Sequence, residues 1–358
     1  MDTYLVGGAV RDQLLGLPVA DKDWVIVGGT AEELQSRGFQ QVGKDFPVYL
    51  HPDSFEEHAL ARTERKTGAG HTDFECDAGP TVTLEQDLYR RDLTINAIAQ
   101  NEHGELIDPY DGQSDLNNKI LRHVSPAFSE DPLRILRVAR FNARFPDFTI
   151  HPETFELMRT MIRQQVLLDL TPERIFSESE KALATSHPHL YFQILSELGA
   201  HQILWSEIQQ NNITRLSQWQ PDNSPIHAFV ILANGLAEEQ IQGITRRHKF
   251  PKIYRELASL TSRFYGPWQQ TAISGEDIVS YLYEMDAVRR PERFITVCEL
   301  AAASYRADGN NTEEPDPWKG YLAAATNVTS KDVDKDLTGA DISHEIRHEQ
   351  IRRVTGLL

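Results

Sequence analysis

The chain of 358 residues contains only two cysteines, Cys76 and Cys298, and they lie too far apart to form a metal-binding or redox motif. No apolar run approaches the length of a membrane span. The first residues enter a predicted strand without a basic or apolar leader. We therefore expect a protein of the reducing cytoplasm that has no membrane partner.

Positive charge is also scarce. Lysine and arginine total 36 residues, aspartate and glutamate total 53, and the formal net charge is −17. This balance argues against a nucleic-acid partner, because phosphate binding usually requires a basic surface. A local basic surface can still exist inside an acidic whole. The distribution of the arginines therefore matters more than the net charge.

Two common phosphate-binding patterns are missing, since the chain has neither a G-x-G-x-x-G fingerprint nor a P-loop. What it has instead is a strand at residues 4–6, the pair Gly7-Gly8, a predicted helix over residues 9–15 and a second strand over residues 24–27. Glycine permits a tight turn and close approach of the backbone to a ligand. The helix that follows directs amide groups and partial positive charge toward that turn.

Two carboxylates stand just before the second strand, in the motif Asp21-Lys22-Asp23. Residues two apart in a strand share a face, so Asp21 and Asp23 are expected to point the same way. Paired carboxylates beside a glycine turn can hold Mg²⁺ between the protein and a nucleoside triphosphate. A single D-x-D motif is also common on solvated loops, so the prediction depends on the motifs that accompany it.

The segment 83–99 has helical spacing and contains the charged run Arg90-Arg91-Asp92 followed by Asn96. The bland interpretation is a solvated helix face. The functional interpretation rests on the family resemblance given below: it is a contact of Arg91 with triphosphate oxygens, which the fixed donors of a guanidinium suit better than lysine does. Asp92 and Asn96, one turn apart, could bond to ribose or brace the arginine. Upstream, residues 57–61 are a predicted strand, and residues 63–80 read as a surface loop.

A third cluster is a helix expected to begin at a Ser129 cap. At about 100° per residue, four arginines of this helix fall within an arc of about 120°; they are Arg134, Arg137, Arg140 and Arg144. Because only Arg134 has an acid four residues before it, we expect self-repulsion that requires an anionic partner. The later motif T-P-E-R-I-F-S-E begins another helix, in which Arg174 and Glu178 are expected to pair.

Four motifs occur in order: LVGGAVRDQLLG followed by DKDW, then RRDLTIN, EDPLR and TPERIFSE. In this the chain resembles the class II branch of the polymerase β nucleotidyltransferase superfamily, which comprises the tRNA CCA-adding enzymes and bacterial poly(A) polymerases. The match is closest to the bacterial CCA-adding enzymes. Larger relatives carry an HD phosphohydrolase domain, but this chain contains no His-Asp dipeptide, so we predict that it lacks that domain and its activity.

The resemblance implies an α+β fold: a polymerase β-like nucleotidyltransferase domain with a small mixed sheet at residues 1–125, followed by all-α domains. Residues 126–205 would form a helical domain that recognises the nucleotide base. Residues 206–358 would form a helical body and tail that bind tRNA. A full-length loop at residues 63–80 favours complete CCA addition, because in the family such a loop helps to switch from adding C to adding A.

The implied reaction is template-independent addition of C, C and A to the 3′ end of tRNA, using CTP, ATP and Mg²⁺. Asp21 and Asp23 would bind the metal ions, and Glu57 would supply a third catalytic carboxylate. Asp131 and Arg134 would read the base. The full set of implied nucleotide contacts is Gly8, Arg11, Arg91, Asp92, Asn96, Asp131, Arg134, Arg137 and Arg140.

Two alternatives remain open at this stage. One is a poly(A) polymerase of the same fold, which the acidic balance disfavours. The other is a non-catalytic tRNA-binding protein, which the intact carboxylate pair disfavours. The sequence does not decide between complete and partial CCA addition, and it does not give the oligomeric state or the residues of 206–358 that contact tRNA.

Overall fold

The computed structural model describes residues 1–42, 48–66, 74–270, 272–310, 317–332 and 340–358. The chain divides into two compact units, which are described separately below. Unit 1 comprises residues 1–178 and 190–204, and unit 2 comprises residues 179–189 and 205–358. The three-part division predicted from the sequence stays a prediction.

Unit 1 is built on a seven-stranded sheet with the strand order β3-β4-β5-β2-β1-β8-β9. Only β2 and β5 are parallel, and the other neighbours are antiparallel, so the predicted small mixed sheet is confirmed. The strands are β1 (Asp2–Val6), β2 (Asp23–Val27), β3 (Gln40–Val42), β4 (Val48–Leu50), β5 (Glu57–Leu60), β8 (Ala99–Gln100) and β9 (Leu106–Ile107).

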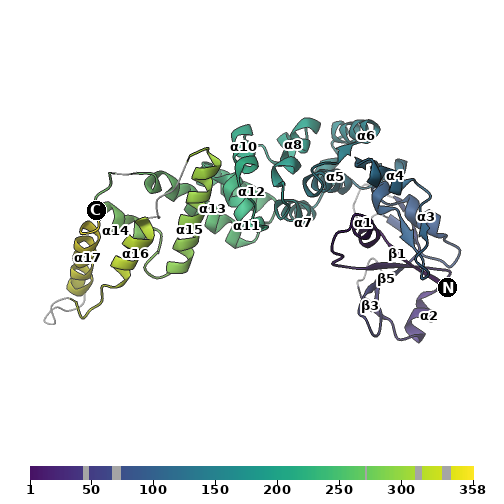
Figure 1. Ribbon diagram of the computed structural model, residues 1–358, viewed down its shortest axis with the longest axis horizontal. Helices are drawn as coiled ribbons and strands as arrows, with labels where there is room; N and C mark the ends of the chain where they lie inside the picture. Colours follow the sequence, from purple (N-terminus) through teal and green to yellow (C-terminus); the bar gives the residue numbers. More distant parts are fainter. Residues whose placement is uncertain (43–47, 67–73, 271, 311–316, 333–339) are drawn as a thin grey trace. The chain divides into compact units, whose positions relative to one another are not determined.

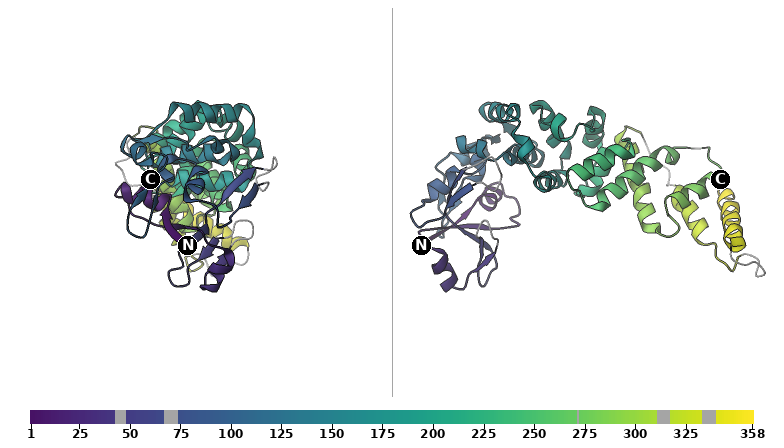
Figure 2. Two further views of the ribbon diagram at one scale, coloured as in Figure 1. Left: turned by 90° about the vertical axis from the view of Figure 1, so that its right-hand side faces the viewer. Right: turned by 180° about the vertical axis from the view of Figure 1, so that it is seen from behind.

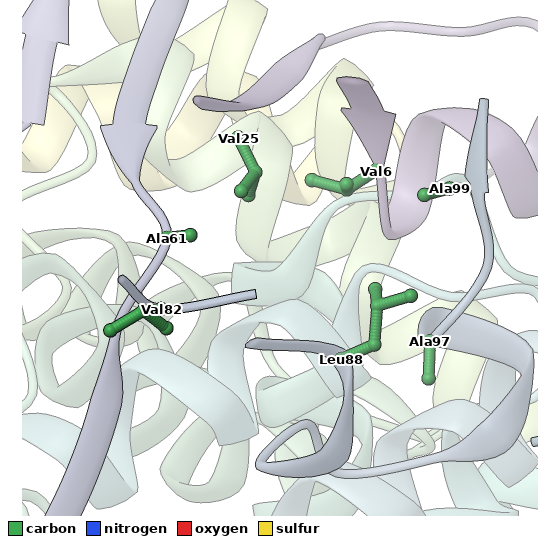
Figure 3. Close-up of a cluster of buried hydrophobic side chains, with 7 residues drawn as sticks. All are labelled: Val6, Val25, Ala61, Val82, Leu88, Ala97 and Ala99. Carbon is green, nitrogen blue, oxygen red and sulfur yellow. The ribbon is translucent and has the colours of Figure 1, made fainter. Parts of the chain in front are cut away.

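The two faces of β2 pack into different cores. Val25 belongs to a buried cluster that includes Val6 and Leu88, drawn in Figure 3. Its neighbour Ile26 packs into a second cluster with Leu34. Because successive strand residues point to opposite faces, apolar burial on both sides fixes the register of this strand. Residues 23 and 25 therefore share one face of the sheet, and residues 24 and 26 share the other.

Short helices surround this sheet and continue beyond it (Figure 1). The α-helices that begin in unit 1, with α7 running on into unit 2, are α1 (Gly8–Leu14), α2 (Ala31–Ser36), α3 (Leu84–Tyr89), α4 (Gly112–Asn117), α5 (Leu133–Arg144), α6 (Pro152–Arg163), α7 (Pro172–Leu183) and α9 (His201–Leu204). Three 3₁₀ helices are η1 (Thr94–Asn96), η2 (Pro126–Glu130) and η3 (Val166–Asp169). The helix α8 (Pro188–Leu198) begins in unit 2 and continues in unit 1.

The helix predicted over residues 83–99 is wrong beyond Tyr89. It starts as expected after a Thr83 capping box, but the chain then leaves the helix. The amide of Thr94 donates to the carbonyl of Arg122, and Leu93 bridges to His123. These tertiary bonds satisfy backbone groups that a continuous helix would have paired internally.

The surface loop predicted at residues 63–80 is wrong at its two ends. Strands β6 (Thr63–Lys66) and β7 (Phe74–Asp77) pair antiparallel there. The centre, residues 67–73, lies outside the described residues. The predicted role of this segment in switching between C and A stays a prediction.

The expected start of the arginine helix at Ser129 is also wrong. Ser125 caps the 3₁₀ helix η2, and α5 begins only at Leu133, after Pro132. Proline cannot donate an amide to a preceding turn, so it divides η2 from α5. As a result, Asp131 stands before the helix in an extended conformation, and its side chain accepts from the amide of Leu133.

Unit 2 contains helices alone in its described part, as expected for residues 206–358 (Figure 2). They are α10 (Gln210–Gln218), α11 (Pro225–Ala233), α12 (Glu238–Arg247), α13 (Lys252–Trp268), α14 (Gly275–Glu284), α15 (Pro291–Ala307), α16 (Pro317–Thr326) and α17 (Ala340–Thr355). Across the described residues of the chain, no helix has both the length and the apolar character needed to cross a bilayer.

Candidate functional site

Three carboxylates gather where β2 and β5 begin. Asp23 opens β2, Asp21 stands two residues earlier, and Glu57 opposes Asp23 in the parallel register of the two strands. All three residues are exposed. Within the described part of the chain, none of these carboxyl groups has a hydrogen bond or an ion pair. They are therefore available to an external cation.

The electrostatics at Asp23 favour such a cation. Partial desolvation raises the pKa of Asp23, and the negative charge of Asp21 raises it further, while the nearby charge of Arg91 acts in the opposite direction. Two hard oxygen ligands with unbalanced charge suit Mg²⁺, which usually keeps water and phosphate oxygens as its other ligands. No group of three or more His, Cys, Asp and Glu side chains that could hold a metal occurs among the described residues. The metal site at Asp21 and Asp23 therefore stays a prediction, as does the role of Glu57.

The turn before α1 brings the backbone close to Arg91. Gly7 has φ 69°, and a Cβ added there would lie 2.9 Å from Nη1 of Arg91. Glycine is thus favoured by the backbone conformation, and a larger residue would also displace the end of the Arg91 side chain. The guanidinium of Arg91 is held by Asp87 at 3.1 Å. A nucleotide contact at Arg91 or at the adjacent Gly8 stays a prediction.

Asp87 is fully buried and was missed by sequence reasoning. Burial acts to raise the pKa of Asp87, but the charges of Arg91 and Arg90 outweigh it and lower the pKa. The carboxylate therefore stays ionised and fixes both arginines. The available signal was spacing, because Asp87 precedes Arg90 and Arg91 by three and four residues, at the end of a helix.

Arg11 lies inside the protein, only 3% exposed. Its guanidinium donates to Asp12 at 2.9 Å and to Asn96 at 2.5 Å, and it lies over the rings of Phe141 and Phe145. Its donors thus face protein groups in this structure. The predicted contact of Arg11 with triphosphate oxygens stays a prediction.

Asp92 joins the second motif to the arginine helix. One of its carboxyl oxygens accepts from the amide of Leu93 and from the side chain of Asn96, and the other accepts from Arg137 at 2.7 Å. Burial would raise the pKa of Asp92, but the charge of Arg137 and these hydrogen bonds hold it far below its usual range. In turn, Asp92 raises the pKa of Arg137. The side chains of this pair hold Arg137 and Arg11 rather than Arg91, whose guanidinium is held by Asp87.

The remaining arginines of α5 also find partners within the chain. Arg140 donates to Glu178 at 2.6 Å, and Arg144 pairs with Asp12 at 2.8 Å. The expectation that this stripe requires an external anion is therefore wrong for these contacts. The reason is tertiary: the acids come from α1 and α7, far away in sequence. The predicted pairing of Arg174 with Glu178 gives way to the contacts of these residues with Asp131 and Arg140.

The two predicted base-reading residues lie at the start of α5. Asp131 accepts from the amide of Leu133 with one oxygen and from Arg174 with the other, at 2.8 Å. Arg134 donates to the carbonyls of Ala127 and Arg90. Both side chains are half-buried and fixed by several elements. A planar, preorganised donor and acceptor of this kind can recognise an edge of a base.

The chain matches two family models. The first is described as "Poly A polymerase head domain" and matches residues 3–122. The second is described as "Probable RNA and SrmB- binding site of polymerase A" and matches residues 147–211. Together they cover the sheet of unit 1 and several of the helices that follow it.

Among curated proteins, the chain is 45% identical over 363 residues to "CCA-adding enzyme" of Coxiella burnetii, with 98% of this chain and 95% of that protein covered. It is 43% identical over 368 residues to "Multifunctional CCA protein" of Mannheimia succiniciproducens, with 90% of this chain and 88% of that protein covered.

Among solved structures, "The structure of CCA-adding enzyme apo form II" has a TM-score of 0.72 at 21% identity, covering 99% of this chain and 88% of that one. "Crystal structure of Bacillus stearothermophilus CCA-adding enzyme in complex with CTP" has a TM-score of 0.70 at 24% identity, covering 99% and 89%. These structures establish the fold. By its identity to curated proteins over nearly the whole length, the chain belongs to the family of CCA-adding enzymes.

Proposed function

We propose that this nucleotidyltransferase adds C, C and A to the 3′ end of tRNA, using CTP and ATP and releasing pyrophosphate. The observation that carries the proposal is the exposed, unengaged pair Asp21 and Asp23 beside the glycine turn and Arg91, in a chain 45% identical to a CCA-adding enzyme. We also propose a cytoplasmic location, because two cysteines in 358 residues suit a reducing compartment.

Nucleotidyltransferases of this kind generally use divalent metals, and we propose Mg²⁺ here. Asp21 and Asp23 would hold it, since their carboxyl groups have no partner among the described residues. Desolvation, and to a smaller extent the charge of Asp21, raise the pKa of Asp23, and a cation would offset both effects. When bound, the ion supplies neutralisation of phosphate charge and acidification of the attacking hydroxyl. Glu57 lies beside Asp23 across the strand pair and would add negative charge to the same edge.

The protein's own groups would position the nucleotide. Arg91 is held by Asp87 and projects at the Gly7 turn, so its remaining donors can meet triphosphate oxygens next to Gly8. Asn96 ties Arg11 to the Asp92 carboxylate and would keep this wall rigid. Catalysis of phosphoryl-type transfer depends mainly on such positioning and charge neutralisation.

Base selection would fall to Asp131 and Arg134. The aspartate accepts hydrogen bonds and the arginine donates them, so the pair can complement the edges of both cytosine and adenine. Arg137 and Arg140 would hold the surrounding elements in place, because Arg137 is bound to the carboxylate of Asp92 and Arg140 to that of Glu178. Recognition of tRNA by shape at its acceptor stem would fall to residues 206–358.

The test uses a tRNA transcript that lacks its 3′ CCA, supplied with Mg²⁺ and with CTP, ATP or both. We expect growth by two residues with CTP alone and by one more when ATP is added, as read on a sequencing gel. Asp21→Ala should abolish extension, whereas Glu102→Ala, an exposed acid in the same unit, should not.

The two alternatives have distinct outcomes in the same experiment. A long ladder of A residues would place the protein with the poly(A) polymerases. No extension, together with retained binding of the transcript, would leave a non-catalytic tRNA-binding protein. Growth that stops after CC in the presence of both nucleotides would restrict the proposal to partial addition.

A further inference from the structure

A cavity of 600 Å³ lies on the sheet face opposite to the metal-binding aspartates. Its walls come from β1, β2, β5, the segment after α2 and the turn between β4 and β5. Trp24 lines it, and Trp24 follows Asp23 directly in β2, so the two side chains project from opposite faces. The cavity is therefore separate from the proposed nucleotide site, although the two share strands.

Aromatic rings form much of this cavity. Trp24 and His58 oppose each other in the β2–β5 register, and their rings are parallel within 9° at a centroid distance of 5.7 Å. Phe39 meets His58 edge-on at 5.2 Å, and His51 lies 5.5 Å from His58. Burial lowers the pKa of His58, as does the neighbouring His51, so the ring of His58 stays neutral at pH 7. Neutral, closely set rings suit stacking with a planar heterocycle.

One acceptor in the wall can discriminate among heterocycles. The Glu56 carboxylate accepts from the indole of Trp24 at 2.8 Å and pairs with Lys22 at 3.2 Å, using one contact per oxygen. Each oxygen has a further lone pair. The amino groups of cytosine and adenine donate to a carboxylate, whereas uracil presents carbonyl oxygens at the corresponding position.

The charges of the wall favour a base over a phosphate group. Arg37 and the terminal amino group of Met1 contribute two positive charges to the lining, and Asp53 and Glu56 contribute two negative charges. A triphosphate would therefore meet no net attraction here. A drug-sized ligand typically occupies roughly 300–1,000 Å³, so a single nucleoside fits the volume.

The turn that forms one wall is held in an unusual conformation. Phe55 is 67% exposed and has φ 58°. A positive φ is rare for a bulky residue. His51 accepts from the amides of Asp53 and Ser54 at 3.3 Å and thereby fixes the turn. Backbone strain of this kind often marks a site of ligand contact, and here it sets Ser54 and Glu56 into the cavity wall.

We propose that this cavity binds an unpaired nucleobase, such as cytosine or adenine, whose ring stacks on the aromatic side chains and whose amino group donates a hydrogen bond to Glu56. The base could come from a free nucleoside or nucleotide, or from a single-stranded part of an RNA. This inference does not depend on the proposed reaction, because it concerns binding on the other face of the sheet.

The test is an NMR titration of the full chain labelled with ¹³C at its histidine rings, without divalent metal. His51→Gln and His58→Gln assign the two resonances. Cytidine and adenosine should each shift both signals saturably, and uridine should bind at least about fivefold more weakly. Ser54→Trp fills the cavity and should weaken cytidine binding about tenfold or more.

The matched control is Leu168→Trp, which places the same indole at a residue of unit 1 that is 68% exposed and should leave binding unchanged. A short oligocytidine that binds at least tenfold more tightly than cytidine would identify RNA as the source, and equal binding of CTP and cytidine would identify free nucleotides. The proposal is overturned if no ligand shifts the two signals, if Ser54→Trp leaves the shifts intact, or if uridine binds as well as cytidine. Because no addition reaction is measured, these outcomes are independent of the proposed function.

Discussion

The two units bury different kinds of polar group. Among the described residues, every buried aspartate, glutamate and arginine lies in unit 1; these are Arg11, Asp12, Asp87, Asp92, Asp115 and Glu178. The buried polar residues of unit 2 are uncharged at neutral pH or are histidine; they are Ser179, Asn212, Asn234, Thr245, His248, Thr261, Ser304 and Gln350. Buried charge therefore accompanies the predicted nucleotide site.

This difference has a physical meaning. Burying an ion pair costs desolvation that its attraction only partly returns, so such pairs are poor sources of stability. They do fix geometry, and in unit 1 they join α1, α5 and α7 to the segment after α3. Unit 2 packs apolar and aromatic groups instead, for example Phe264 against Phe294 and Trp318. We infer that the buried ion pairs of unit 1 make its site rigid but add little to its stability.

The largest expected effect is a loss of reaction rate when an exposed carboxylate of unit 1 is removed. Asp23→Asn should lower the rate of nucleotide addition at least about a thousandfold, equivalent to about 4 kcal/mol, because it removes a metal ligand. Its stability should not fall, since the exposed carboxyl of Asp23 has no bonding partner in the described part of the chain and repels Asp21. Single-turnover kinetics and urea denaturation measure the two effects. A stable variant with near-normal rate would contradict the metal assignment.

Breaking a buried ion pair should instead lower the stability of the protein. Arg137→Met leaves the Asp92 carboxylate buried without its 2.7 Å partner, so we expect a loss of about 3 kcal/mol of unfolding free energy in unit 1. Hydrogen exchange resolved by peptide would localise the loss. The matched control is Arg159→Met, whose partner Glu156 is 2.9 Å away at the surface and whose loss should stay below about 1 kcal/mol. Equal losses in both variants would show that burial does not distinguish them.

The same pair predicts a dependence on pH. The folded-state pKa of Asp92 lies below its unfolded value of about 3.9, so its contribution is complete above that value and is lost as the pH falls through the folded pKa. In Arg137→Met the pKa of Asp92 should be lowered less, because the charge of Arg137 is gone. The stability difference between wild type and variant should therefore shrink as the pH falls below about 4. Urea midpoints between pH 7 and pH 3 test this, and a constant difference would argue against the linkage.

The smallest effect is expected in unit 2. The hydroxyl of Thr261 is fully buried and has no hydrogen-bond partner among the residues that the structure describes. Thr261→Val should therefore stabilise this unit by about 1 kcal/mol, because an unpaired polar group is replaced by a methyl group. Thr245→Val is the matched control: its hydroxyl donates to Ile241 at 2.8 Å, so its loss should cost about 1 kcal/mol. Thermal unfolding of both variants tests this prediction, and a larger loss of stability in Thr261→Val than in Thr245→Val would contradict it.

Local patterns were predicted well where the energy is local. The capping box of Thr30 and Glu33 is an example of a feature that sequence spacing alone can predict, because both of its bonds lie within four residues. Strand β2 was expected within one residue of its observed start, since its apolar residues pack on both faces. By contrast, the end of α3 was not predicted. The amide of Thr94 donates to the carbonyl of Arg122, and this partner lies too far along the chain for a local sequence pattern to reveal it.

By itself, the sequence determined the chemical inventory: a D-x-D pair, a glycine turn, the run of Arg91 and Asp92, and an arginine helix, in an order typical of one family. These features follow from residue type and short spacing. Only the tertiary structure decided which groups remain available. It left Asp21 and Asp23 open, placed Arg11 inside, and paired Arg140 and Arg144 of α5 with acids of α7 and α1. The reason is that a charge finds its lowest free energy beside a partner in space, and that partner is set by the fold rather than by distance along the chain.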